Sequence, residues 1–177
     1  EGLSTPSAAL LKASLLVSGE EMLYGYPSMT TGWGRANLTS VLPTKTHTVF
    51  YDDVTTGLTT GQEYTVNLSQ VQQGAPLKVS LVWSDYPGTP GVTPHLVNDL
   101  DLVVTSPSGV VYNGNDFSAP FNDVVDRLNN VEIVRITAPE NGDYSVTVKA
   151  ENIPMPNQPF ALVAIYDNVR TMHFFRK

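Results

Sequence analysis

Apolar and polar side chains alternate in Leu77-Lys78-Val79-Ser80-Leu81-Val82-Trp83, the stretch that decides the fold. This two-residue period is typical of a half-buried β-strand, because successive side chains of a strand point to opposite faces of a sheet. Further stretches of this kind lie at 47–51, 64–68, 99–104, 110–112, 131–136, 144–148 and 160–165. The sequence therefore predicts a mainly β domain of about eight short strands.

Turn-forming residues separate these stretches. Two strong turn signals are Ser106-Pro107-Ser108-Gly109 and Glu140-Asn141-Gly142-Asp143. Residues 154–159 contain three prolines and are expected to form a loop, because each proline removes a ladder donor. Short strands at regular spacing with such turns favour an antiparallel jelly-roll sandwich.

The N-terminal part follows a different pattern and predicts one α-helix over residues 5–19. Thr5 can cap this helix, Pro6 fits its first turn, and Gly19 can end it in a left-handed conformation. The apolar residues of the segment cover almost every side of the predicted helix, so it should be buried on most sides. No other segment is helical enough to surround it. We therefore expect much of its packing partner to lie outside this chain.

Composition narrows the classes of partner. The chain has 177 residues, a hydrophobic content of 41% and a formal net charge of -7. That content can fill a sizeable core. The negative charge argues against nucleic acid and anionic membranes as partners, since both need Lys and Arg. The chain has no cysteine, which excludes disulfides, thiolate metal sites and a cysteine nucleophile.

Two blocks of sequence carry a resemblance to a known family. The predicted helix with Gly32-Trp33-Gly34-Arg35-Ala36-Asn37-Leu38 resembles the end of a subtilisin-like serine protease catalytic domain. The stretches 77–85, 96–102, 112–117 and 129–132 are together similar to the C-terminal β domain of large, kexin-like alkaline serine proteases. The resemblance implies a secreted endopeptidase. It divides the chain into residues 1–43, the last catalytic segment, and residues 44–177, the jelly-roll domain.

The catalytic motifs of that family do not occur in this chain. There is no Gly-Thr-Ser sequence, and His47, His95 and His173 lie in no triad context. We therefore predict no catalytic residue here and expect the Ser-His-Asp chemistry upstream. The implied partner is that upstream catalytic portion, on the same precursor or on a separate chain. Protein substrates would be reached only through the whole enzyme.

An oxygen-rich cluster predicts a calcium site. Strand periodicity places Asp99 and Asp101 on one face, where two carboxylates repel each other unless a cation lies between them. Calcium prefers such oxygen ligands, and the family's β domain is similar in carrying structural calcium. The predicted metal ligands are Asp85, Asp99, Asp101, Asp116, Asn130 and Glu132. The alternative is that these residues form turns by bonding their own backbone.

Other functions remain open at this stage. Trp33 and Trp83, with tyrosines 24, 26, 51, 86 and 112, could form a sugar-binding platform, although aromatic residues at strand positions more often pack in cores. The long loop 85–94 could reach a neighbouring domain or serve as a rigid connector. The alternative to a protease part is thus a stand-alone carbohydrate- or protein-binding module. A third possibility is a structural domain used in adhesion or secretion.

Overall fold

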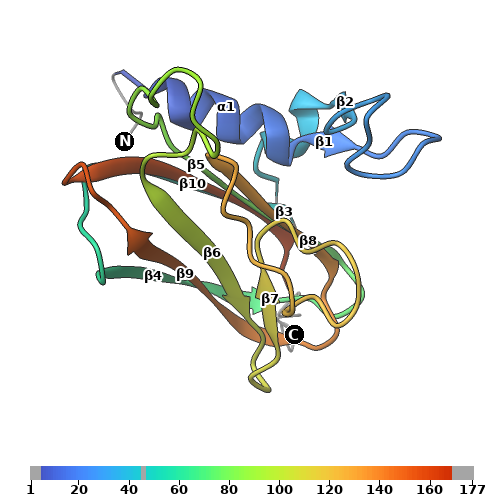
Figure 1. The fold of residues 1–177 in the computed structure, drawn as a ribbon. Coiled ribbons are helices and arrows are strands. Elements are labelled where there is room, and N and C mark those ends of the chain that lie inside the picture. Colours follow the sequence, from blue (N-terminus) through green and yellow to red (C-terminus); the bar gives the residue numbers. More distant parts are fainter. Residues whose placement is uncertain (1–4, 45–46, 169–177) are drawn as a thin grey trace, which may run out of the picture.

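Two four-stranded antiparallel sheets form the body of the molecule (Figure 1). The computed structural model describes residues 5–44 and 47–168. The first sheet contains β3 (His47–Leu58), β5 (Pro76–Val82), β8 (Val131–Thr137) and β10 (Gln158–Asp167). The second sheet contains β4 (Glu63–Val71), β6 (Asp99–Thr105), β7 (Val111–Asn113) and β9 (Gly142–Asn152). Each stretch predicted to be a strand corresponds to one of these elements.

The strand order is that of a jelly roll. The first sheet has the order β3-β10-β5-β8 and the second the order β4-β9-β6-β7. The chain therefore crosses between the sheets repeatedly and pairs its first sandwich strand with its last. This arrangement confirms the predicted fold class, an antiparallel jelly-roll sandwich.

The main core lies between the two sheets. Its largest side chains are Trp83, Tyr144 and Phe160, all essentially inaccessible to water. Alternation supplies this core: in β9, Tyr144, Val146 and Val148 face inward, whereas the residues between them are partly exposed.

The N-terminal segment contains α1 (Ala8–Val17), the short pair β1 (Gly19–Glu20) and β2 (Arg35–Ala36), and the 3-10 helix η1 (Leu38–Val41). The helix begins later than predicted, since Ser7 rather than Thr5 caps it by accepting a hydrogen bond from Leu10 N at 3.0 Å. Gly19 does not adopt a left-handed conformation. A glycine is needed there because a Cβ would lie 2.1 Å from the carbonyl oxygen of Trp33.

Helix α1 lies across the outer face of the first sheet (Figure 1). Its buried residues Ala9, Leu10, Ala13 and Val17 pack on an outward-facing apolar layer of the sheet, formed by Val82, Val131, Ile133, Ala161, Val163 and Ile165. The expectation that much of the packing partner of the helix lies outside this chain is therefore wrong for this face. The opposite face of the helix is open to solvent, with Leu11 56% and Leu15 50% exposed.

Hydrogen bonds fasten the N-terminal segment to the sandwich. Ser7 N and Oγ both donate to the carboxylate of Asp53 on β3, at 2.8 and 2.7 Å. At the other end of the segment, the Tyr51 hydroxyl donates to the carbonyl oxygen of Val41. Within the described residues, α1 is the only α-helix, and no helix is long and apolar enough to cross a membrane.

Candidate functional site

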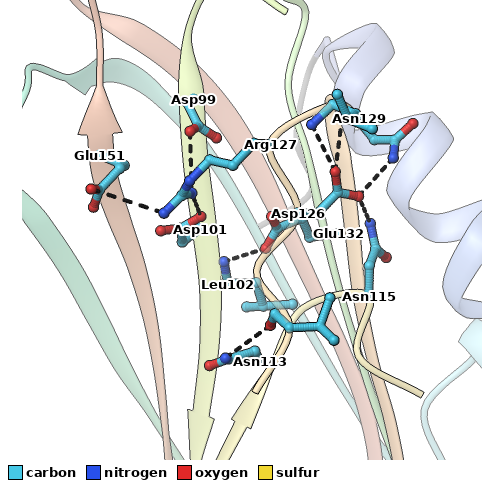
Figure 2. Close-up of polar contacts among 12 residues, drawn as sticks. Asp99, Asp101, Leu102, Asn113, Asn115, Asp126, Arg127, Asn129, Glu132 and Glu151 are labelled. Atoms are coloured by element: carbon cyan, nitrogen blue, oxygen red, sulfur yellow. Dashed lines mark hydrogen bonds and ion pairs between the residues drawn. The ribbon is translucent and has the colours of Figure 1, made fainter. Parts of the chain in front are cut away.

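The residues predicted as ligands converge best at the edge where β6 and β8 approach each other (Figure 2). Strand β7 pairs only with residues 103–105 of β6. Beyond it, Gly114 N still donates to the carbonyl of Leu102 at 2.8 Å, but among the described residues the N–H of Leu102 has no backbone acceptor on that side. The carboxylate of Glu132 on β8 fills the gap by accepting a hydrogen bond from Leu102 N at 2.5 Å. Glu132 therefore joins the two sheets.

Glu132 is buried in an unusual way for a carboxylate. Its residue is only 1% exposed, and its Oε1 atom has no hydrogen-bond partner among the described residues. Gly114 makes the room, since a Cβ there would lie 2.2 Å from Glu132 Oε2. Burial raises the pKa of Glu132 well above its ordinary value, and the nearby charges of Asp101 and Asp126 add to this effect.

Asp99 and Asp101 lie beside this carboxylate and share one cation. Arg127 Nη1 is 3.1 Å from Asp99 Oδ2 and also donates to Asp101 Oδ1. Burial raises the pKa of Asp99 to about 6, and Arg127 opposes that rise. The repulsion between the two carboxylates, which suggested calcium, is thus met by a guanidinium of the chain itself.

The remaining predicted ligands have other partners. Both oxygens of Asp85 accept from backbone, Oδ2 from Val97 N at 2.7 Å and Oδ1 from Asn98 N at 2.9 Å. Asp116 accepts from the backbone of residues 118, 123 and 124, which lowers its pKa despite an opposing effect of burial. The side-chain nitrogen of Asn130 donates to the carbonyl of Trp83. Asp116 thus bonds the backbone of its own loop, as in the turn-forming alternative, whereas Asp85 and Asn130 bond backbone of segments more distant in the sequence.

The sequence did not single out Arg127 as a partner of this cluster. Asp126, which was not among the predicted ligands, also belongs here. It accepts hydrogen bonds from Asn115 Nδ2 at 2.6 Å and from Leu128 N at 2.8 Å. The feature of the sequence that could have indicated this partner is the presence of a basic residue, Arg127, in the irregular segment that follows β6 and β7.

A cavity of about 180 Å³ opens beside Glu132, and its polar lining consists of Asp101, Asn113, Asp126, Glu132, Lys149 and Glu151. Carboxylate and amide oxygens of this kind are chemically suited to calcium. In the arrangement shown, however, no group of three or more His, Cys, Asp or Glu side chains among the described residues is placed to hold a metal ion. A bound cation would need Arg127 to release Asp101, and 42% exposure of the arginine side chain leaves it room to move.

A His-Asp pair exists but does not build a triad. His47 Nδ1 is 3.0 Å from Asp167 Oδ1, and its Nε2 is 2.6 Å from the backbone oxygen of Ser40. The hydroxyl of Ser40 instead donates to the carbonyl of Asn37 at 2.8 Å. Within residues 5–44 and 47–168, the Ser40 hydroxyl is thus not directed at this histidine. His95 lies in the loop after β5, and His173 lies outside the described residues.

The aromatic residues mainly pack. Trp83 is buried in the core and donates its indole N–H to the carbonyl of Asn98 at 3.0 Å. Trp33 and Phe117 each meet Tyr26 edge-on, at 5.8 and 6.0 Å between ring centroids. These contacts form a small aromatic cluster under the N-terminal segment rather than an exposed row.

Comparison with known proteins gives two relatives with related names. The chain is 29% identical over 171 residues to the serine protease/ABC transporter B family protein tagA of Dictyostelium discoideum, which covers 89% of this chain and 10% of that protein. It is 33% identical over 90 residues to tagB of the same organism, covering 48% of this chain and 5% of that protein. The chain is thus distantly related to proteins named as serine proteases and spans about a tenth of their length or less.

No protein-family model matches the chain. Among solved structures, it is similar to the tripod of the bacteriophage Tuc2009 baseplate, with 16% identity and a TM-score of 0.34 over 70% of this chain and 90% of that one. A GH115 4-O-methyl-alpha-glucuronidase matches with 12% identity and a TM-score of 0.34 over 77% of this chain and 19% of that one. Similarity at this level carries no conclusion about function.

Proposed function

We propose that this chain is a non-catalytic part of a larger, secreted subtilisin-like serine endopeptidase, and that it stabilises the catalytic part. The distant relatives named as serine proteases support this origin, and each is many times longer than the matched segment. The resemblance of residues 1–43 to the end of a subtilisin-like catalytic domain points to the same partner.

The exposed apolar surface of the N-terminal segment carries this proposal. Leu11 and Leu15 on α1 are at least half exposed, and Leu23 and Met29 in the following loop are almost fully exposed. Leu11 and Leu15 lie one helical turn apart on the same face of α1, and neighbouring exposed apolar side chains of this kind are suited to an interaction site. The catalytic part of the same protease is the occupant we propose, because this segment resembles the end of that domain.

The test compares two double variants in the full-length parent protein. Leu11→Ser with Leu15→Ser should lower the temperature at which protease activity is lost, because the proposed interface loses apolar contact. The control, Val110→Ser with Leu128→Ser, changes two exposed apolar residues that precede β7 and β8 and should have no effect. In the isolated chain, both double variants should leave the melting temperature unchanged. Equal inactivation temperatures of the two double variants in the parent protein would argue against this interface.

We also propose that the cavity beside Glu132 binds calcium. The unpaired Oε1 of Glu132 and the carboxylates of Asp101 and Asp126 support this site. A cation there would lower the cost of burying Glu132 as an anion, and it would stabilise the fold by binding the folded form only. Excess chelator should then lower the melting temperature of the chain, and calcium rather than magnesium should restore it. An unchanged melting temperature, with no calcium found in the purified protein, would leave Arg127 as the cation of this cluster.

A further inference from the structure

A second pair of like charges lies on the outer face of the first sheet, beside the N-terminal segment. Lys78 on β5 and Arg135 on β8 are directly opposite in the antiparallel register. Both side chains point to the outer face, since their neighbours Leu77, Val79 and Val134 belong to the core between the sheets. Like charges directly opposite each other destabilise a sheet. The pair therefore needs negative charge or oxygen acceptors nearby.

The chain supplies only part of that compensation. Lys78 Nζ donates to the carbonyl oxygen of Gly19 at 2.8 Å, which uses one of the three donors of an ammonium group. Arg135 Nη1 is buried without a hydrogen-bond partner among the described residues. Burial lowers the pKa of Lys78, and the charge of Arg135 lowers it further.

Two carboxylates border the same groove, but neither neutralises the pair closely. Glu20 is held by Arg35 at 2.7 Å and by Asn37 at 2.6 Å. Glu21 is half exposed and its Oε2 lies 3.7 Å from Arg135 Nη2, which is too long for a hydrogen bond. Glu21 is thus a weak counter-ion that an incoming anion can displace.

The groove has the size and the walls of a ligand site. It encloses about 700 Å³ between the N-terminal segment and strands β5 and β8, and its lining includes Tyr26, Phe117 and Ile136 beside the two cations. The guanidinium carbon of Arg135 lies 4.3 Å from the centroid of the Tyr26 ring. Stacking of this kind fixes the plane of the guanidinium and leaves its N–H edge for a planar carboxylate.

We infer that this groove binds an acidic peptide, with a carboxylate held between Arg135 and Lys78 and an adjacent apolar side chain against Phe117. The volume exceeds what an inorganic anion needs and falls in the range of sites for organic ligands. This assignment does not depend on the proposed protease origin.

The test measures binding of a capped hexapeptide containing adjacent Glu and Phe, and of its Gln counterpart, to the full chain by calorimetry. The Glu peptide should bind at least about tenfold more tightly, as expected for a charge-assisted contact. Arg135→Gln should remove that preference and Arg135→Lys should keep only part of it, because lysine lacks the planar fork. Glu21→Gln should tighten binding, since it removes the resident competitor. Lys12→Gln, at an exposed position of α1, is the control for loss of a positive charge and should bind the peptide normally.

Equal affinity for the Glu and Gln peptides would overturn the inference. Binding of inorganic phosphate with no binding of the Glu peptide would also overturn it, because the groove would then be a simple anion site. Melting curves of each variant establish that the protein is folded at the temperature of the titration. If Arg135→Gln does not fold, Glu21→Gln and Arg135→Lys still decide the outcome, since they predict changes in opposite directions.

Discussion

The acidic cluster and the basic groove present the same electrostatic problem with opposite sign. Asp99 and Asp101 lie two residues apart on β6, and Lys78 and Arg135 lie opposite each other on β5 and β8. In the acidic cluster, Arg127 contacts both carboxylates. In the basic groove, the chain supplies one backbone oxygen and two carboxylates, Glu20 and Glu21, neither of which accepts a hydrogen bond from Lys78 or Arg135 among the described residues. The difference teaches that one pair is neutralised within the fold, whereas the other is left for a ligand.

The largest expected effect comes from removing each central arginine in turn. Arg127→Gln leaves two poorly solvated carboxylates without a cation and should cost about 2 kcal/mol, a value reduced for the partial exposure of the arginine. This corresponds to a melting temperature about 4–8 °C lower. Arg135→Gln also removes a repulsion and should cost less than about 1 kcal/mol. Urea unfolding at neutral pH measures the free energy of unfolding of both variants. Equal losses of stability would contradict the view that only the acidic pair is neutralised within the fold.

Glu132→Gln tests whether the buried carboxylate is held by a metal. In chelator at neutral pH, the variant should melt a few degrees higher, because the raised pKa of Glu132 makes the folded state disfavour the ionised form that predominates in the unfolded chain. In excess calcium, the variant should lack the stabilisation that the unmodified chain gains. A lower melting temperature of the variant in chelator would mean that the hydrogen bond from Leu102 N to the carboxylate stabilises the fold by more than the burial of the charge destabilises it.

The pH dependence of stability tests the acidic cluster further. Asp99 has a folded-state pKa of about 6 against an ordinary value of 3.8, so the folded form binds its proton more tightly. Stability should therefore fall as the pH rises from about 4 to about 6, because the unfolded state then binds fewer protons than the folded state. Asp99→Asn should flatten the melting temperature over this window in chelator. If the melting temperature of Asp99→Asn falls with pH as steeply as that of the unmodified chain, other groups are responsible for the pH dependence.

The smallest effect is expected for Glu21→Gln without ligand. The contact between Glu21 and Arg135 is long and exposed, and such ion pairs contribute little to stability. The substitution should change the free energy of unfolding by less than about 0.5 kcal/mol, which thermal melting measures. A larger loss would show that Glu21 is a structural partner of Arg135. The basic pair would then be neutralised within the fold, as the acidic pair is.

The positions of the strands could be predicted from the sequence, and so in part could the surface on which the helix packs. Every residue of Phe160–Ile165 is apolar, which is typical of a strand buried on both faces. This run indicated that the outer face of the first sheet is covered, and α1 covers it. The signal was present in the sequence, although the stretch was interpreted as one more alternating strand.

The candidate site was predictable only in part. Placing Asp99 and Asp101 on one face required nothing beyond the period of a strand. Arg127 lies 26 residues after Asp101 in the sequence. Its pairing with Asp101 depends on how the long irregular segment that carries it folds back onto β6. Sequence spacing does not determine such a return. Asp85 and Asp116 were grouped with the cluster because of their residue type, whereas each is used by nearby backbone amides.

The covering of the first sheet by α1 has a practical consequence for dissecting the protein. A version shortened to start at residue 44 would uncover Val82, Ile133 and Val163, which α1 now shields. Such a flat hydrophobic sheet surface invites self-association, and aggregation of that version would say nothing about the intrinsic stability of the sandwich. Recombinant versions should therefore begin before Ser7, whose side chain both starts the helix and bonds to β3.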